Sequence, residues 1–314
     1  MKAPSANTLR LLIPAVSLVA LLGAVFYLQP RAMSYTGLNL LFNLAVPIAL
    51  ATIAQMIIIA VNDLDLSMGP FVSFAACVTA AFMPTQPVLA VLILLGAIGV
   101  YALIGFMIAY RDLPSIVVTL GMSFVWGGLA VIILPAPGGQ APEWLRAVMT
   151  AKPPFMPMAI VASIVIAVVA HLLIMRTTFG VVIRGVGGNA RSVARAGWSV
   201  LRVKASAYAL AGVFAVLSGM ALVGLTTSAD ANIALRYTLL SIAGVILGGG
   251  EFVGGRVSPI GAVVGALTLT LAASFLSFLR ISPDWQIGAQ GAILIVVLGL
   301  RLLFNRHDVR AGKE

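Results

Sequence analysis

The chain has 314 residues, of which 61% are hydrophobic and only 9% are charged. Soluble domains carry about 25% charged residues, so this composition excludes a water-soluble globule and predicts a chain that is solvated mainly by lipid. The net charge of +10 would indicate nucleic-acid binding in a soluble protein, but no basic face with interleaved aromatic residues accompanies it, so we expect no nucleic-acid partner.

The sequence also shows no motif for catalysis or for a metal site. Cys77 is the single cysteine, so neither an internal disulfide nor a cysteine zinc site is available. The sequence contains no phosphate-binding G-x-x-x-x-G-K-[ST] loop, no G-x-S-x-G and no H-E-x-x-H. We therefore expect no enzyme activity, no catalytic residues, no metal and no cofactor in this chain.

Apolar segments follow one another along the whole chain and predict an all-α bundle of about ten membrane-spanning helices, with 1–314 as one transmembrane domain. No small-residue cleavage site follows the first segment, so we interpret it as a retained span. Fusing the short segments gives an eight-span alternative. The predicted spans are 11–28, 38–61, 66–83, 88–110, 114–135, 156–175, 204–226, 236–250, 258–280 and 286–304.

The basic residues orient this bundle. If both termini are cytoplasmic, the inside segments hold 14 of the 19 Lys and Arg residues and the outside segments hold 5. Such an excess is typical of cytoplasmic loops. Six of the basic residues, with no acid among them, lie in the segment 176–204. This segment is too long for a simple turn and is suited to docking a soluble partner.

A short helix is predicted inside that basic segment. Asn189 is a good N-cap for a helix over 190–196, and Gly197 is suited to end it. Arg191 and Arg195 then lie on one face. A short tethered helix is what a force-transmitting contact with a soluble partner needs, and attraction to anionic membrane lipid explains the same charges.

Three junctions between spans are irregular: 61–70 with two acids, 135–157 with six prolines, and 248–261 with six glycines. Helix breaks near membrane depth are tolerated where protein or a water-filled cavity covers them, and they often mark transport pathways. Asp63 and Asp65 fit an ion site, a helix cap or a partner contact. We favour capping of a helix that starts near Met68, with Asp65 and Ser67 as caps and Pro70 in its first turn.

Four segments, in order, resemble the ribose-type permeases, the membrane subunits of ATP-binding-cassette (ABC) importers for sugars. AVNDLDLSMGPFVSF resembles that family's G-G-I-D-L-S-x-G, and LPSIVVTLGMSFVWGGLA resembles its P-x-F-I-x-T-L-G helix. TTFGVVIRGVGGNARSVARAGWSV is similar to its G-G-N loop. SIAGVILGGGEFVGGRVSPIGAVVGAL is similar to its glycine-rich segment near the end of the chain.

The resemblance implies a bacterial inner-membrane bundle that works as a dimer with a second permease chain. A cytoplasmic ATPase subunit would hold ATP and Mg²⁺, and a periplasmic binding protein would deliver the solute. By this match the G-G-N loop docks the ATPase. The docking residues expected from the match and from the basic segment are Arg184, Gly187, Gly188, Asn189, Arg191, Ala194, Arg195 and Gly197.

This chain departs from the family pattern at several positions. Asn62 and Asp63 replace paired glycines, Gly250 and Glu251 replace Thr-Ser, and Val181 replaces an Arg. These replacements motivate the hypothesis that the chain pairs with a different permease rather than with itself.

The solute is expected to be small and polar, with a monosaccharide favoured by the G-G-N form of the loop. Sparse intramembrane charge argues against proton coupling. An ion-coupled secondary transporter, a non-transporting scaffold, and an importer of nucleosides, autoinducers or branched-chain amino acids remain alternatives. Candidate pathway or gate residues are Asn62, Asp63, Asp65, Ser67, Thr119, Ser123, Trp126, Gly249 and Glu251.

Overall fold

The computed structural model describes residues 6–279, 288 and 292. Within this part of the chain the structure is helical and has no β-strand, only an isolated bridge between Gly138 and Ala229. The helices are α1 (Ala6–Leu28), α2 (Tyr35–Phe42), α3 (Ala45–Ala60), α4 (Met68–Phe82), α5 (Pro87–Arg111), α6 (Ser115–Ile133), α7 (Glu143–Met149), α8 (Met158–Met175), α9 (Thr178–Arg195), α10 (Val200–Thr226), α11 (Tyr237–Leu247) and α12 (Pro259–Phe278), with a 3₁₀ turn at Pro30–Met33.

The all-helical prediction is confirmed, whereas the number of spans is established only in part. Six stretches among the described residues are long and apolar enough to cross a membrane, and three shorter apolar helices accompany them. The nine predicted spans from 11–28 to 258–280 each coincide with one helix, except that 38–61 is divided between α2 and α3. The tenth, 286–304, lies outside the described residues. The six stretches are Tyr35–Ala60, Pro87–Arg111, Ser115–Ile133, Met158–Met175, Val200–Thr226 and Pro259–Phe278.

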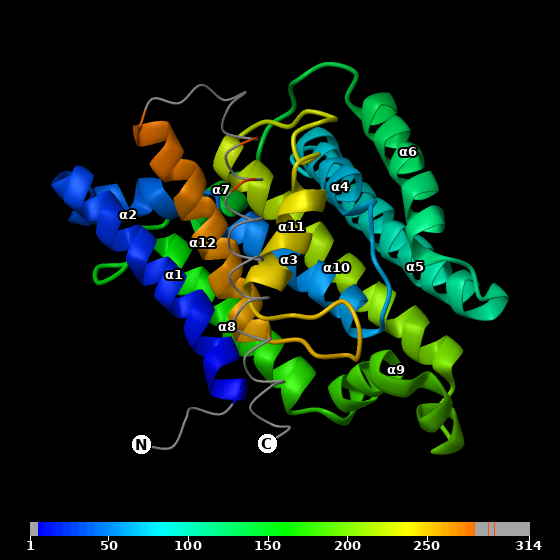
Figure 1. Ribbon diagram of the computed structural model, residues 1–314. Coiled ribbons are helices and arrows are strands. Elements are labelled where there is room, and N and C mark those ends of the chain that lie inside the picture. The colour runs from blue at the N-terminus through cyan, green and yellow to red at the C-terminus, as the bar shows by residue number, and fades with distance from the viewer. Residues whose placement is uncertain (1–5, 280–287, 289–291, 293–314) are drawn as a thin grey trace, which may run out of the picture.

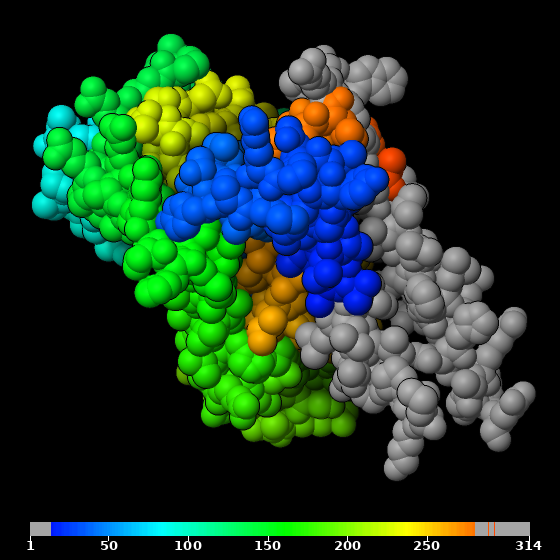
Figure 2. All heavy atoms as spheres, turned by 90° about the vertical axis from the view of Figure 1, so that its left-hand side faces the viewer, coloured from blue at the N-terminus to red at the C-terminus, as the bar shows by residue number. Residues whose placement is uncertain are grey.

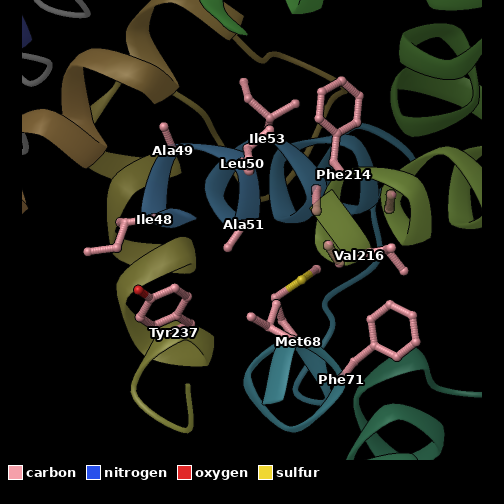
Figure 3. Close-up of a cluster of buried hydrophobic side chains, with 14 of the residues drawn as sticks. Ile48, Ala49, Leu50, Ala51, Ile53, Met68, Phe71, Phe214, Val216 and Tyr237 are labelled. Atoms are coloured by element: carbon pink, nitrogen blue, oxygen red, sulfur yellow. The ribbon is translucent and has the colours of Figure 1, made fainter. Parts of the chain in front are cut away.

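Helix α3 occupies the centre of the bundle. All sixteen of its residues are buried, because its sequence AVPIALATIAQMIIIA offers no polar face. Figure 3 shows its side chains extending in several directions, with Ala51 directed toward Met68 of α4 and Ile53 directed away from it. The long helix α10 packs along α3, α4 and α5, so that α3, α4 and α10 form the core on which the other helices rest (Figure 1).

Glycines set how closely α11 and α12 approach. Gly244 on α11 and Gly248, the C-cap of that helix, face Gly261 and Gly265 on α12, and a methyl group added at Gly261 would collide with the Gly248 carbonyl. Membrane helices pack through such small residues because lipid offers no hydrophobic force between them. These glycines therefore allow the close packing of α12 against α11 and its C-cap.

The two ends of the bundle differ in character. Figure 1 shows α9 and the connection 248–258 at one end, and the connection between α6 and α7 at the opposite end. At that opposite end the proline-rich segment contains α7, whose Leu145 packs against Gly224 near the end of α10. In contrast, α5 and α6 present many exposed apolar side chains, as expected of a surface that faces lipid or another membrane chain.

Candidate functional site

The break between α3 and α4 is an extended segment whose backbone is bound by other helices. Asn62 ends α3 with a positive φ of 65°. Beyond it, the Leu64 amide donates to Ser115 Oγ at 3.1 Å and the Leu66 amide donates to Thr119 Oγ1 at 3.0 Å. The Gly69 amide, in the first turn of α4, donates to Thr238 Oγ1 of α11 at 2.9 Å. Side chains of α6 and α11 therefore satisfy the backbone amides that this break leaves free.

Asp65 lies at the centre of the break and is fully buried. Its Oδ1 accepts hydrogen bonds from the Ser67 amide at 2.6 Å and from Ser67 Oγ at 2.7 Å, and Tyr101 donates its hydroxyl to Oδ2. The Gln55 side-chain amide, oriented to satisfy both partners, pairs with the backbone of Asp65 at 3.2 Å. Burial raises the pKa of the Asp65 carboxyl, and these donors oppose that effect.

The predicted capping role of Asp65 and Ser67 is wrong in its detail. Neither side chain accepts a hydrogen bond from the first turn of α4. Asp65 instead binds the amide of Ser67, which precedes the helix, and Thr238 of α11 accepts from the helix itself. The position of Pro70 in the first turn of α4 is confirmed.

Asp63 has a partner that the sequence did not reveal. Lys204 Nζ lies 2.9 Å from Asp63 Oδ1, with side-chain exposures of 17% and 7%, and the Tyr208 hydroxyl lies 3.4 Å from Oδ2. Burial raises the pKa of the Asp63 carboxyl, and the adjacent Lys204 ammonium opposes this effect. Lys204 lies in the second turn of α10, so this ion pair joins the broken segment to the helix that follows the basic segment.

The three candidate residues on α6 have different surroundings. Thr119 is buried and holds the broken segment, while Ser123 donates to the Leu120 carbonyl of its own helix at 2.6 Å. Trp126 is buried against the rings of Phe71 and Phe74, with centroids 4.8 and 5.1 Å away. Its Nε1 has no hydrogen-bond partner among the described residues. The geometry thus shows packing of α6 on α4.

The glycine-rich connection 248–258 lies against the basic segment. Gly249, Gly254 and Gly255 have positive φ values of 92°, 90° and 65°. Across its turn the Glu251 amide donates to the Arg256 carbonyl at 2.9 Å, and their side chains form an ion pair at 3.5 Å. These residues lie at the α9 end of the bundle, whereas Asp65 is buried beside Tyr101 of α5.

Helix α9 consists of two helices that meet at Asn189. Asn189 has φ −160° and ψ 94°, and its Oδ1 accepts a hydrogen bond from the Ser192 amide at 3.0 Å. Gly197 follows with φ 88°, and the Trp198 amide donates to the Val193 carbonyl at 3.3 Å, which closes the helix in a Schellman motif. The predicted short helix, its cap and its terminating glycine are confirmed. The preceding helix, capped by Thr177, was not predicted.

The predicted docking residues divide into buried and exposed sets. Gly187 is buried, and a methyl group there would collide with the Ala60 carbonyl at the end of α3 and approach Gly255. Arg184 is half-buried. The exposed residues surround the short helix and are Gly188, Asn189, Arg191, Ala194, Arg195 and Gly197. One flank of the segment is therefore anchored in the bundle, while the other is presented to solvent.

Comparison with known proteins gives a consistent result. The profile of the family described as "Branched-chain amino acid transport system / permease component" matches residues 37–298. A probable ABC transporter permease protein, y4mJ of Sinorhizobium fredii, is 30% identical over 290 residues, which cover 90% of this chain and 87% of the relative.

Two further relatives carry sugar names. The galactose/methyl galactoside import permease protein MglC of Escherichia coli is 29% identical over 310 residues, covering 91% and 92% of the two chains. The ribose import permease protein RbsC of the same species is 25% identical over 298 residues, covering 90% and 91%. No solved structure matches the chain.

Proposed function

We propose that this chain, which belongs to the family of branched-chain amino acid transport system permease components, is the membrane subunit of an ABC importer. We further propose that its solute is a monosaccharide. It is an inner-membrane permease and a transporter subunit rather than an enzyme. The sugar names of MglC and RbsC, which align over about nine-tenths of the chain, support this choice of solute.

The partners follow from the importer assignment. We propose a cytoplasmic ATPase that holds ATP and Mg²⁺, a periplasmic binding protein, and a second permease chain that is either a copy or a different subunit. Residues 1–314 form one transmembrane domain of about ten spans with both termini in the cytoplasm. The exposed apolar faces of α5 and α6 offer contact area to lipid or to the second permease chain.

The observation that carries the coupling mechanism is the exposed short helix between Asn189 and Gly197. It is capped at both ends and presents Arg191 and Arg195 to solvent. The segment that precedes it packs through Gly187 against the end of the core helix α3. Docking of the ATPase on this helix would move α9 and the start of α10 together. Such a helix can transmit force because it is short, rigid and tethered on both sides.

The ion pair between Lys204 and Asp63 could pass this motion from α10 to the broken segment between α3 and α4. The ion pair ties the start of α10 to the broken segment, whose backbone is held in turn by Ser115, Thr119 and Thr238. We therefore assign the segments 61–67 and 248–258 to a gate rather than to solute binding. For 61–67 this assignment is supported by the carboxylates of Asp63 and Asp65, which bind Lys204 and Ser67 of the same chain.

The family description keeps a branched-chain amino acid as the second candidate solute. The test is reconstitution of the chain in proteoliposomes with the ATPase and binding protein encoded beside it, followed by uptake of radiolabelled solutes. We expect ATP-dependent monosaccharide uptake that an uncoupler does not affect. Uptake of leucine instead of sugar would replace the solute, and ATP-independent uptake abolished by an uncoupler would replace the importer with a secondary transporter.

A further inference from the structure

A pocket of about 860 Å³ lies at the α9 end of the bundle. It is formed by the last turns of α8, the first half of α9 and the turn that leads into α12. Figure 2 shows the corresponding face, where gold and orange atoms of the glycine-rich turn and α12 lie in a hollow between the green helices and blue α1. The residues that define its chemistry are His171, Met175, Arg184, Arg256, Ser258 and Ile260.

One wall of the pocket is cationic. Arg184 Nε donates to the Gly180 carbonyl at 3.3 Å, which holds the side chain against α9. Arg256 is 63% exposed and pairs with Glu251 at 3.5 Å, a long and partly solvated pair that contributes little to stability. His171 adds an imidazole from α8. A phosphate group entering here would meet two guanidinium groups, which suit its geometry.

The other wall is apolar and lies at the level where membrane helices end. Met175 is the last residue of the spanning helix α8, and Ile260 lies in the first turn of the spanning helix α12. Ile260 is 45% exposed and Val181, on α9, is 55% exposed. A ligand that fills this pocket would therefore need an anionic head and an apolar body.

A close backbone contact and a helix cap fix the shape of the pocket. Gly255 has a positive φ of 65°, and a methyl group there would collide with the Arg184 carbonyl. Ser258 Oγ accepts a hydrogen bond from the Gly261 amide at 3.1 Å and so fixes the start of α12. The backbone segments that carry Arg184 and Arg256 are thus held together by packing at Gly255 before any ligand arrives.

We propose that this pocket binds the phosphate group of an anionic glycerophospholipid of the cytoplasmic leaflet. Basic pockets between membrane helices on the cytoplasmic side are suited to such head groups. Soluble phosphate and nucleotides share the phosphate chemistry, but they would leave the apolar wall unused. A lipid bound here would touch α8, α9 and α12 together and would stabilise the base of the docking segment.

The test is native mass spectrometry of the purified full-length chain with phosphatidylglycerol. We expect Arg184→Gln to weaken binding about fivefold, and the Arg184→Gln/Arg256→Gln double variant to weaken it on the order of twentyfold, because each arginine near a lipid surface contributes about that factor. Arg111→Gln is the matched control, since Arg111 lies over the Tyr110 ring at the end of α5 and should leave binding unchanged.

Two further measurements separate the sources of phosphate. Phosphatidylethanolamine should bind weakly, and millimolar inorganic phosphate or ATP should not displace phosphatidylglycerol. Displacement by either soluble anion would overturn the lipid assignment, and equal binding by the double variant and the wild type would overturn the site. A thermal unfolding scan of each variant shows that it is folded, and solute uptake by reconstituted importer remains a separate test of function.

Discussion

The ion pair between Asp63 and Lys204 illustrates how a single residue is constrained inside a membrane bundle. A nearly buried carboxylate requires a partner, because removing one member of such a pair leaves an uncompensated charge. The sequence departs from the family pattern at Asp63, and the structure supplies the compensating lysine from α10. The pair therefore compensates the charge of Asp63 within this chain.

We predict that Lys204→Met lowers the free energy of unfolding by about 3 kcal/mol, while Asp63→Asn/Lys204→Met loses much less because no charge is left unpaired. Burial raises the pKa of the Asp63 carboxyl, so the folded single variant binds a proton more readily than the unfolded chain does. The loss in free energy of unfolding caused by Lys204→Met should therefore shrink as the pH falls and grow as the pH rises. Thermal unfolding at several pH values measures this, and equal deficits in the single and double variants would contradict it.

The neighbouring glycines at 187 and 188 make a matched pair of tests. Gly187→Ala should destabilise the protein, because its methyl group would collide with the Ala60 carbonyl, whereas Gly188 has only the Gly254 carbonyl at 3.6 Å from an added Cβ. Gly188→Arg should therefore fold normally and yet block ATPase docking. Expression and thermal stability measure the first effect, and co-purification with the ATPase measures the second. A docked, fully active Gly188→Arg complex would exclude this surface from the interface.

At the scale of an element, the short helix beyond Asn189 depends on its cap. Asn189→Pro removes the side chain that accepts from Ser192 and imposes a φ near −65° in place of −160°. We expect it to abolish coupling of ATP hydrolysis to transport while the bundle stays folded. Asn189→Asp, which caps a helix about as well, should retain coupling. Coupling measured as solute transported per ATP hydrolysed should separate these variants, and equal ratios would contradict the role of the helix.

The contact of α11 with α12 gives a second element-scale prediction. Gly261→Ala should destabilise the protein, since the added methyl group would collide with the Gly248 carbonyl. Gly99→Ala on α5 is the control, because nothing lies within 4 Å of its Cβ position and alanine favours a helix over glycine by about 1 kcal/mol. Thermal unfolding compares the two, and similar melting temperatures would show that α11 and α12 can separate without cost.

Structural features that depend on neighbouring residues can be predicted from this sequence, whereas contacts between residues far apart in the chain cannot. Apolar runs predict the helices. The cap at Asn189 and the helix end at Gly197 depend only on neighbouring residues, so the sequence predicts them as well. The partner of Asp63 is Lys204, 141 positions away, and the acceptor for Gly69 is Thr238, 169 positions away. Pairs this distant leave no pattern in one sequence. A helix face alone likewise does not reveal that Phe71 and Phe74 pack against Trp126.

At the scale of the whole molecule, the two ends of the bundle carry different structural features. The α9 end carries the capped short helix, the Asp63–Lys204 pair and the basic pocket, whereas the opposite end carries the proline-rich connection and α7. This arrangement suits an importer that receives a solute on one side and an ATPase on the other. It also requires that the basic segment face the cytoplasm, which the distribution of Lys and Arg predicts.

That orientation can be measured with one substitution. Ser192 is exposed on the short helix and Cys77 is the only natural cysteine and is buried, so Ser192→Cys creates a single accessible thiol. We predict that a membrane-impermeant maleimide labels this thiol in inside-out vesicles, that bound ATPase protects it, and that it stays unlabelled in intact cells. Labelling from outside intact cells would place the segment in the periplasm and contradict the coupling mechanism.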